Sequence, residues 1–211
     1  MMPGLPVVPT LPVVPTLPVV PTLPVVIVLA AGRGQRFLAS GGTAHKLDTL
    51  LDGKAVLSHT LAAVHASGLP WHLVRPEGGT DGMGESIAMG VQATAEAAGW
   101  LILPGDLPLV QALTLQRVAQ ALTEQTIIVP RFHQQQGHPV GFGRHYFDAL
   151  ASLQGDVGAA AIVREARVSG NVQDLPVTDD GIAHDVDTRA DLDLAQDLLR
   201  ARRLQIHSHS R

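Results

Sequence analysis

The stretch VVIVLAAGRGQR, residues 25–36, decides the fold of this chain. Its first part is a continuous apolar, β-branched run, which is typical of a strand buried on both faces. Such strands belong to parallel sheets that carry helices on both sides. Its second part sets two glycines among small and basic residues directly after the strand. We therefore expect a buried parallel strand that delivers a glycine-rich loop to one edge of a sheet.

Strands and helices alternate along the rest of the sequence. We expect helices over residues 54–68, 86–99, 112–124, 144–153, 158–166 and 191–203, and strands over residues 71–74, 100–106 and 126–130 and near Val172. This alternation predicts βαβ units in an α/β fold, a Rossmann-like three-layer sandwich with a mostly parallel sheet. Ligands of such folds bind at the carboxyl ends of the strands.

A hexapeptide repeat precedes the first strand. The sequence LPVVPT occurs three times between Leu5 and Thr22, and a fourth LPVV continues into the strand. Proline at every third position rules out a helix and favours an extended polyproline II conformation. We predict a proline-rich tail over residues 1–22, one folded domain over residues 23–204 and a C-terminal tail over residues 205–211.

Composition excludes several classes of function. The 211 residues are 45% hydrophobic, which is ample for one core, and the net charge is −4 with scattered lysines and arginines. A broad basic face is therefore missing, and we expect no nucleic-acid partner. The absence of cysteine excludes disulfides and thiolate chemistry and suits a reducing compartment. No apolar run is long enough for a membrane span, so we expect a soluble, cytoplasmic protein.

The glycine-rich loop is the first candidate site. Backbone amides near Gly32 and Gly34 can approach a phosphate, and Arg36 adds positive charge. The pattern is neither GxGxxG, because Phe37 occupies the place of the third glycine, nor a Walker A loop. Lys46, ten residues further on, is within reach of the same phosphates. The structural alternative is a turn with solvated basic side chains.

Two aspartates are candidate ligands of Mg²⁺. Asp106 follows an apolar strand in the sequence LILPGDLP, where a carboxylate can hold the ion against phosphate oxygens. Asp187 lies in HDVDT, ahead of the last helix. Each has a structural alternative: Asp106 as the cap of a turn or helix, and Asp187 together with Thr188 as the cap of the last helix.

Three further glycine-rich segments complete the set of candidates. QQQGHPVGF, residues 134–142, presents His138 in a tight turn, although a lone histidine in a loop is more often structural or exposed than catalytic. DGMGESI, residues 81–87, and GDVGAAAI, residues 155–162, begin helices whose amides can hold an anion or the polar edge of a ring.

Taken in order, LAAGRGQR, Lys46, GMGESI, PGDLP, GHPVGF, GDVGA and DVDT resemble the nucleotidyltransferases that attach a nucleotide to the molybdenum cofactor, especially the cytidylyltransferases. The resemblance runs from Val25 to about Leu199. It implies a fold of the nucleotide-diphospho-sugar transferase type. It also implies an enzyme that transfers CMP from CTP to the terminal phosphate of molybdopterin and releases pyrophosphate, with Mg²⁺ as cofactor.

The resemblance also implies a role for each motif. The residues implied to bind nucleotide are Leu29, Ala30, Ala31, Gly32, Gly34, Arg36, Lys46, Ser86 and Asp106. Among them Arg36, Lys46 and Asp106 are implied to be catalytic, and Asp106 and Asp187 to hold the metal. The loop of Gly137, His138, Pro139 and Val140 is implied to face the pterin. Ala31, in LAAG where guanylyl-transferring relatives have LAGG, favours CTP over GTP.

Two departures from the family pattern have consequences. Only residues 75–81 separate the strand at 71–74 from GMGESI, so we expect the sheet to lack one βα unit. Ala160 stands where an arginine is common, so one contact to phosphate or pterin is expected to be absent. The open alternatives are therefore transfer from GTP or to another acceptor such as a sugar phosphate, and a catalytically weak protein that binds nucleotide or cofactor. The expected partners are CTP, a molybdopterin-type acceptor and a molybdoenzyme or its chaperone.

Overall fold

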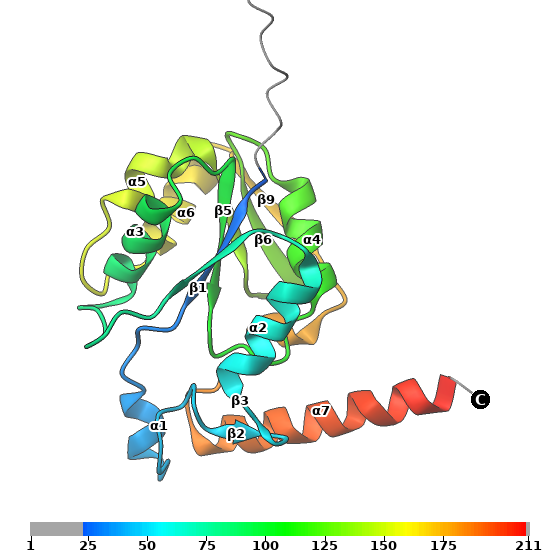
Figure 1. The fold of residues 1–211 in the computed structure, drawn as a ribbon. Coiled ribbons are helices and arrows are strands. Elements are labelled where there is room, and N and C mark those ends of the chain that lie inside the picture. The colour runs from blue at the N-terminus through cyan, green and yellow to red at the C-terminus, as the bar shows by residue number, and fades with distance from the viewer. Residues whose placement is uncertain (1–22, 210–211) are drawn as a thin grey trace, which may run out of the picture.

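Strand β1 (Val25–Leu29) lies inside a seven-stranded sheet in the computed structural model, which describes residues 23–209 (Figure 1). From one edge the strand order is β4 (Trp71–Val74), β1, β5 (Gly99–Pro104), β8 (Val140–Gly143), β6 (Ile127–Phe132) and β7 (Gln135–Gln136), and β9 (Val172–Pro176) also pairs with β6. The predicted repeat tail, residues 1–22, lies outside the described residues.

The sheet is mostly parallel, as predicted. Strand β1 pairs in parallel with β4 and β5, and β6 pairs in parallel with β9. Strand β8 is antiparallel to both of its neighbours, β5 and β6, so those two run in the same direction. The sequence did not predict strands in this segment, yet Gln135–Gln136 form β7 and Val140–Gly143 form β8, because the chain turns back between them and β8 pairs on both sides.

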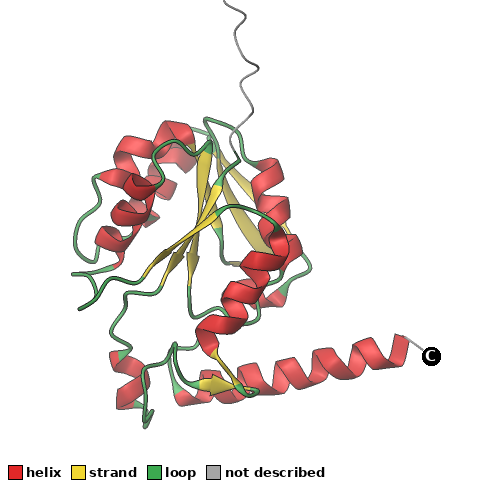
Figure 2. Cartoon of the chain, viewed as in Figure 1, coloured by secondary structure: helices red, strands yellow, loops and turns green. Residues whose placement is uncertain are grey.

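Helices cover both faces of the sheet and make the predicted three-layer sandwich (Figure 2). Alternate residues of β1 belong to different cores: Val26 and Val28 to one, and Ile27 to the other. The first core is closed mainly by α2 (Val56–Ser67) and α4 (Ala112–Ala121). The second is closed by α3 (Met83–Ala93), α5 (Phe147–Ala151) and α6 (Ala160–Val168).

The expected gap in the βα pattern is present. The chain passes from β4 to α3 through residues 75–82 without another helix or strand, and β4 forms an edge of the sheet. Helix α3 packs closely on β1 and β4 through Gly90, because a Cβ there would collide with Ile27. The short connection therefore places the start of α3 beside the loop that follows β1.

Smaller elements surround the carboxyl edge of the sheet. They are α1 (Gln35–Ala39), the hairpin of β2 (Leu50–Leu51) and β3 (Lys54–Ala55), and the 3-10 helix η2 (Asp180–Ala183). The 3-10 helix η1 (Arg144–Tyr146) lies at the opposite edge, because it follows the end of β8 that pairs with the start of β5. Helix α7 (Arg189–His209) runs beside the hairpin and continues five residues past the predicted boundary at 204 (Figure 1). Between residues 23 and 209, no helix has both the length and the apolar character that crossing a membrane requires.

Candidate functional site

The glycine-rich loop leaves β1 at the carboxyl edge of the sheet and is held there by backbone hydrogen bonds. The amide of Ala30 donates to the carbonyl of Val74 at 2.9 Å, and the amide of Gly105 donates to the carbonyl of Leu29 at 2.8 Å. Gly34 has φ 62° and precedes α1, a left-handed conformation that glycine adopts without strain. The loops that follow β1 and β5 are thus fixed side by side.

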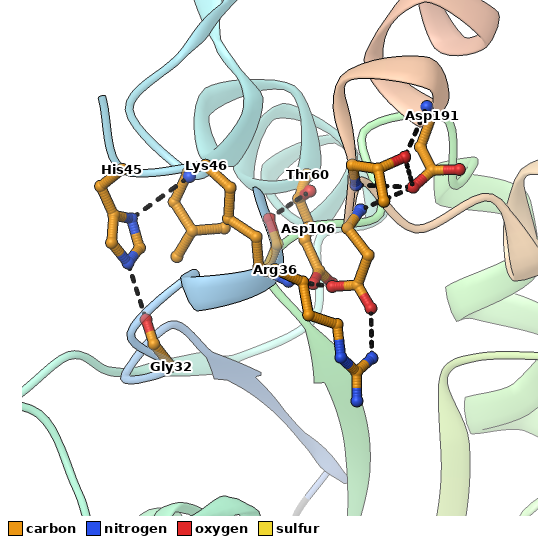
Figure 3. A network of polar contacts seen from close by, with 11 residues as sticks. Gly32, Arg36, His45, Lys46, Thr60, Asp106 and Asp191 are labelled. Carbon is orange, nitrogen blue, oxygen red and sulfur yellow. Dashed lines mark hydrogen bonds and ion pairs between the residues drawn. The ribbon is translucent and has the colours of Figure 1, made fainter. Parts of the chain in front are cut away.

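Lys46 joins the two predicted metal ligands (Figure 3). Its Nζ donates to Asp106 Oδ2 at 2.5 Å and to Asp187 Oδ1 at 2.6 Å. The Lys46 side chain is only 13% exposed, so these contacts are shielded from water. Arg36 is exposed and donates to the other oxygen of Asp187 at 2.8 Å. The structure therefore brings together two basic and two acidic side chains that lie up to 151 positions apart in the sequence.

Backbone contacts explain how the segment around Asp187 reaches Asp106. The amide of Val186 donates to the carbonyl of Asp106 at 2.9 Å, which aligns the two segments. At the start of α7, Asp191 accepts from the amide of Thr188 at 2.6 Å and from its hydroxyl at 2.7 Å (Figure 3). The hydroxyl of Thr188 in turn accepts from the amide of Asp191 at 3.3 Å. Thr188 and Asp191 therefore cap the helix, as considered for Thr188, whereas the Asp187 side chain faces Lys46 instead.

Opposite charges set the protonation of this cluster. Burial alone would lower the pKa of Lys46, but the adjoining carboxylates of Asp106 and Asp187 outweigh it and the pKa is raised. For Asp187, burial opposes the hydrogen bonds from Lys46 and Arg36, and the net effect lowers its pKa. Partial desolvation, together with the charges of Asp106 and Asp187, raises the pKa of Asp185. Lys46 is therefore held as an ammonium between carboxylates.

His45 links the glycine-rich loop to the segment that carries Lys46 (Figure 3). Its Nε2 lies 2.7 Å from the carbonyl oxygen of Gly32, and its Nδ1 accepts from the amide of Leu47 at 3.3 Å. Because Nδ1 accepts, the proton of a neutral ring lies on Nε2, which then donates to Gly32. The histidine thus fixes the distance between the loop and Lys46.

A cavity of about 700 Å³, the first cavity, opens beside the glycine-rich loop. All nine residues implied to bind nucleotide line it: Leu29, Ala30, Ala31, Gly32, Gly34, Arg36, Lys46, Ser86 and Asp106. Ser86 is buried, and its hydroxyl lies 2.7 Å from that of Thr80, another lining residue. The size lies within the usual range for sites of small organic ligands. The roles of the individual residues stay predictions.

A cavity of about 870 Å³, the second cavity, adjoins the first. Gly137, His138 and Val140 of the predicted pterin loop line it, and the buried Pro139 does not. Six residues line both cavities: Arg36, Lys46, Met83, Pro104, Asp106 and Asp187. The cluster around Lys46 is therefore the junction of two adjoining ligand spaces.

The loop of the second cavity is packed tightly against η2. The amide of His138 donates to the carbonyl of Ile182 at 2.8 Å, and a Cβ at Gly137 would collide with that same residue. Nδ1 of His138 is buried and has no hydrogen-bond partner within residues 23–209. Burial lowers the pKa of His138, so the ring is neutral near pH 7. A buried nitrogen without a partner is unusual, because buried polar groups are normally hydrogen-bonded.

The comparison with protein families decides the class of this protein. Residues 64–171, just over half of the chain, match the model of the MobA-like NTP transferase domain. The chain belongs to this family. Membership makes it a transferase of the nucleotidyl type that uses a nucleoside triphosphate, and the predicted nucleotidyltransferase class is confirmed at that level.

Solved structures agree with the family. Rv0371c from Mycobacterium tuberculosis is 25% identical over 83% of this chain and 99% of its own, with a TM-score of 0.67. The same protein has been solved in complex with manganese, with a TM-score of 0.65. A nucleotidyl transfer enzyme from Methanothermobacter, 20% identical over 85% of this chain and 99% of its own, shows the same fold with a TM-score of 0.71. No curated protein sequence matches the chain.

In this MobA-like domain the junction suits a divalent cation. Oδ1 of Asp106 is buried and lacks a hydrogen-bond partner among the described residues, and both carboxylates already contact the single cation of Lys46. The described chain has no cluster of three or more histidine, cysteine, aspartate or glutamate side chains that would form a metal site by itself. Mg²⁺ is commonly bound by one or two carboxylates with phosphate and water, so Asp106 and Asp187 fit it.

Sequence reasoning missed several residues of the MobA-like site. His45 acts through a backbone contact with Gly32 of the glycine-rich loop, and no local pattern marks it. Asp191 contacts Thr188 three residues earlier, and the Thr-x-x-Asp spacing of a capping box could have identified it. Met83 lies in the quoted GMGESI motif, yet its place on the wall between the cavities depends on the packing of α3. Asp185 belongs to the quoted HDVDT motif and lines the second cavity, a position that its spacing from Asp187 could have suggested.

Proposed function

We propose that this MobA-like protein transfers CMP from CTP to the terminal phosphate of molybdopterin and releases pyrophosphate. The observation that carries the proposal is the junction: two adjoining cavities share Lys46, Asp106 and Asp187. A transferase must hold its donor and its acceptor at the same time with the reacting atoms in contact. Two ligand spaces that meet at one charged cluster are what this reaction needs.

The residues of the first cavity suit a nucleoside triphosphate. The loop carrying Gly32 and Gly34 offers backbone amides to phosphate oxygens. Arg36, whose side chain is 82% exposed, would exchange Asp187 for the phosphates. Lys46 would exchange its carboxylate partners for the phosphates when Asp106 and Asp187 take the metal. Bound Mg²⁺ would neutralise charge on the phosphates during the reaction.

The step itself needs no general base. An oxygen of the acceptor phosphate attacks the α-phosphorus of CTP, a new phosphorus–oxygen bond forms, and the bond to the bridging oxygen of the β-phosphate breaks. The electron pair leaves with pyrophosphate. Lys46 and Arg36 offset the charge that develops on the α-phosphate and on the leaving group. The phosphate nucleophile is already ionised near pH 7, so no proton has to be removed first.

The preference for CTP rests on Ala31. This residue is buried to 7% exposure and lines the first cavity, so its methyl group narrows the space beside the loop. A glycine there would widen the cavity for a purine. Ser86 and Thr80, which also line the cavity, are the polar groups near the expected position of the base or ribose.

The second cavity is the proposed site of molybdopterin. Gly137, His138 and Val140, which line this cavity, would lie against the pterin. Pro139 would keep this loop in place behind them. We further propose that the product passes in the cytoplasm to a molybdoenzyme or to its chaperone.

The test is pyrophosphate release with purified protein, Mg²⁺, CTP and molybdopterin. We expect release to depend on all three, and Asp106→Ala to abolish it. Asp197→Ala is the matched control, because Asp197 is an exposed aspartate of α7 that lines neither cavity. A fully active Asp106→Ala protein would contradict the proposal.

The same assay separates the alternatives. Replacing CTP by GTP tests the role given to Ala31, and an acceptor screen with sugar phosphates and alcohol phosphates tests the second cavity. Transfer to one of those acceptors and not to molybdopterin would keep the nucleotidyltransferase class and overturn the acceptor. Calorimetric binding of CTP without any turnover would identify a binding protein instead.

A further inference from the structure

Helix α6 forms one wall of the second cavity with a single face. The lining residues of the helix are Ala160, Val163, Arg164 and Arg167, which lie on one side because they are three or four positions apart. The helix begins beside Met83, since a Cβ at Gly158 would lie 3.1 Å from the sulfur of Met83, which also lines the first cavity. The lining face of α6 therefore begins near the wall between the two cavities and extends away from that wall.

Arg164 differs from the other cations of this cavity. Lys46 and Arg36 are bound to the carboxylates of the junction. Arg167 donates two hydrogen bonds to Asp174 of β9, at 3.0 and 3.2 Å. Arg164 has neither an ion pair nor a hydrogen bond within the described part of the chain, although its side chain lines the cavity. Its charge is therefore available to a ligand.

Apolar side chains also line the second cavity, together with the junction and Arg164. Ile87, Ile102, Val140, Phe142 and Val163 line the second cavity. Ala160 stands at the position where the family pattern commonly has an arginine. It lies one turn before Arg164, about 6 Å along the helix axis. The second cavity is thus lined by the carboxylates that contact Lys46, by apolar side chains and, one turn beyond Ala160 on α6, by the unpaired guanidinium of Arg164.

We propose that Arg164 binds a second anionic group of the acceptor, remote from the phosphate that attacks the nucleotide. The acceptor is then a phosphomonoester with an apolar or flat body and a further negative charge at its far end. This inference rests on the proposed function in one respect, which is that the second cavity holds the acceptor. It names Arg164 as the residue that selects acceptors by charge.

The experiment measures binding of paired probes by calorimetry with the full chain. One probe is an alkanediol bisphosphate, and the other is the alkyl monophosphate of equal chain length. We expect wild type to bind the bisphosphate roughly tenfold more tightly, because a guanidinium bound to a phosphate is a charge-assisted contact. Arg164→Ala should lose this difference without weakening the binding of CTP.

Two more variants complete the design. The double variant Ala160→Arg/Arg164→Ala moves the guanidinium back by one turn and should restore preference for a bisphosphate of shorter chain. Arg200→Ala removes an exposed arginine of α7, distant from both cavities, and should leave the preference unchanged. Equal binding of the two probes by wild type, or a preference that survives in Arg164→Ala, overturns the inference.

The result is independent of the identity of the natural acceptor. If molybdopterin is not a substrate but Arg164→Ala still removes the preference for the bisphosphate, the proposed reaction fails and the inference stands. If molybdopterin is a substrate and its KM is the same in wild type and Arg164→Ala, the inference fails and the proposed reaction stands.

Discussion

Gly32 and Gly137 lie in the loops of the two adjoining cavities, and each is a glycine for a different reason. A Cβ added at Gly32 would meet no atom within 4 Å, because it would point into the space of the first cavity. A Cβ added at Gly137 would collide with the backbone of Ile182. The first glycine leaves room for a ligand, and the second is required by the packing of the protein itself.

This difference extends to the two regions. The nucleotide side takes its longest run of lining residues, 29–37, from the end of β1, the loop that follows it and the start of α1. The pairing of β1 to β4 and β5 fixes where this run begins. The acceptor side is assembled from β8, α6 and η2, which meet only in the folded protein. On the nucleotide side, substitutions should therefore change ligand binding without changing stability. On the acceptor side, they should change ligand binding and stability together.

The largest effect is expected at the junction, where the two regions meet. Lys46→Ala removes the cation that contacts both Asp106 and Asp187. We expect kcat to fall by about 10²–10³-fold, the usual effect of removing one group that stabilises charge in a transition state. Lys46→Arg should not restore the rate, because the planar guanidinium of arginine does not replace the compact ammonium that lies between the two carboxylates. A loss confined to the KM of one substrate would show that Lys46 serves a single cavity.

Gly137→Ala should affect the acceptor side and the stability together. The loop must move away from Ile182, which displaces His138 and Val140 from the second cavity. We expect the KM of the acceptor to rise about tenfold or more and the free energy of unfolding to fall by about 1–3 kcal/mol. Steady-state kinetics and chemical denaturation measure the two effects. An unchanged KM with lowered stability would separate the loop from the acceptor.

Gly32→Ala should affect the nucleotide side alone. The added methyl group enters free space, so we expect the melting temperature to stay within about 2 °C of wild type. The same group narrows the approach of phosphate to the loop, and we expect the KM of CTP to rise several-fold without a change in the KM of the acceptor. Loss of stability comparable with that of Gly137→Ala would remove the distinction between the two glycines.

The smallest effect is expected from Asp174 of β9, which pairs with Arg167 on the wall of the second cavity. Hydrogen bonds from Arg167 and Arg131 lower its pKa below the ordinary value of 3.8. A carboxyl group with a lower pKa in the folded state contributes stability above its unfolded pKa and loses it as the pH falls through the folded value. Asp174→Asn should thus lower the melting temperature by about 2 °C at pH 7 and by less in acid. An equal difference at both pH values would exclude titration of Asp174.

The features that could be predicted from the sequence are those encoded in contiguous stretches. The apolar run of β1 and its glycine-rich loop carry their own signal, and the alternating helices and strands indicated the three-layer fold. Asp106 was predicted for the same reason, because it follows directly on β5. The short segment of residues 75–81 likewise predicted the absence of a βα unit.

The features that could not be predicted depend on contacts between distant segments. Strand β8 contains Gly141 and Gly143, which have low strand propensity, and it forms because β5 and β6 offer it hydrogen bonds on both sides. His45 matters through the carbonyl group of Gly32, which lies in another segment. Arg167 pairs with Asp174 of β9, whereas Arg164 on the same helix has no partner among the described residues. No spacing in the sequence reveals this difference between the two arginines.

The most direct test of this account is a crystal structure with CTP and Mn²⁺, with the ion located by its anomalous scattering. The account predicts triphosphate in the first cavity and one cation in contact with both Asp106 and Asp187, with the α-phosphate facing an open second cavity. Triphosphate in the second cavity, or a cation bound away from these two carboxylates, would contradict it.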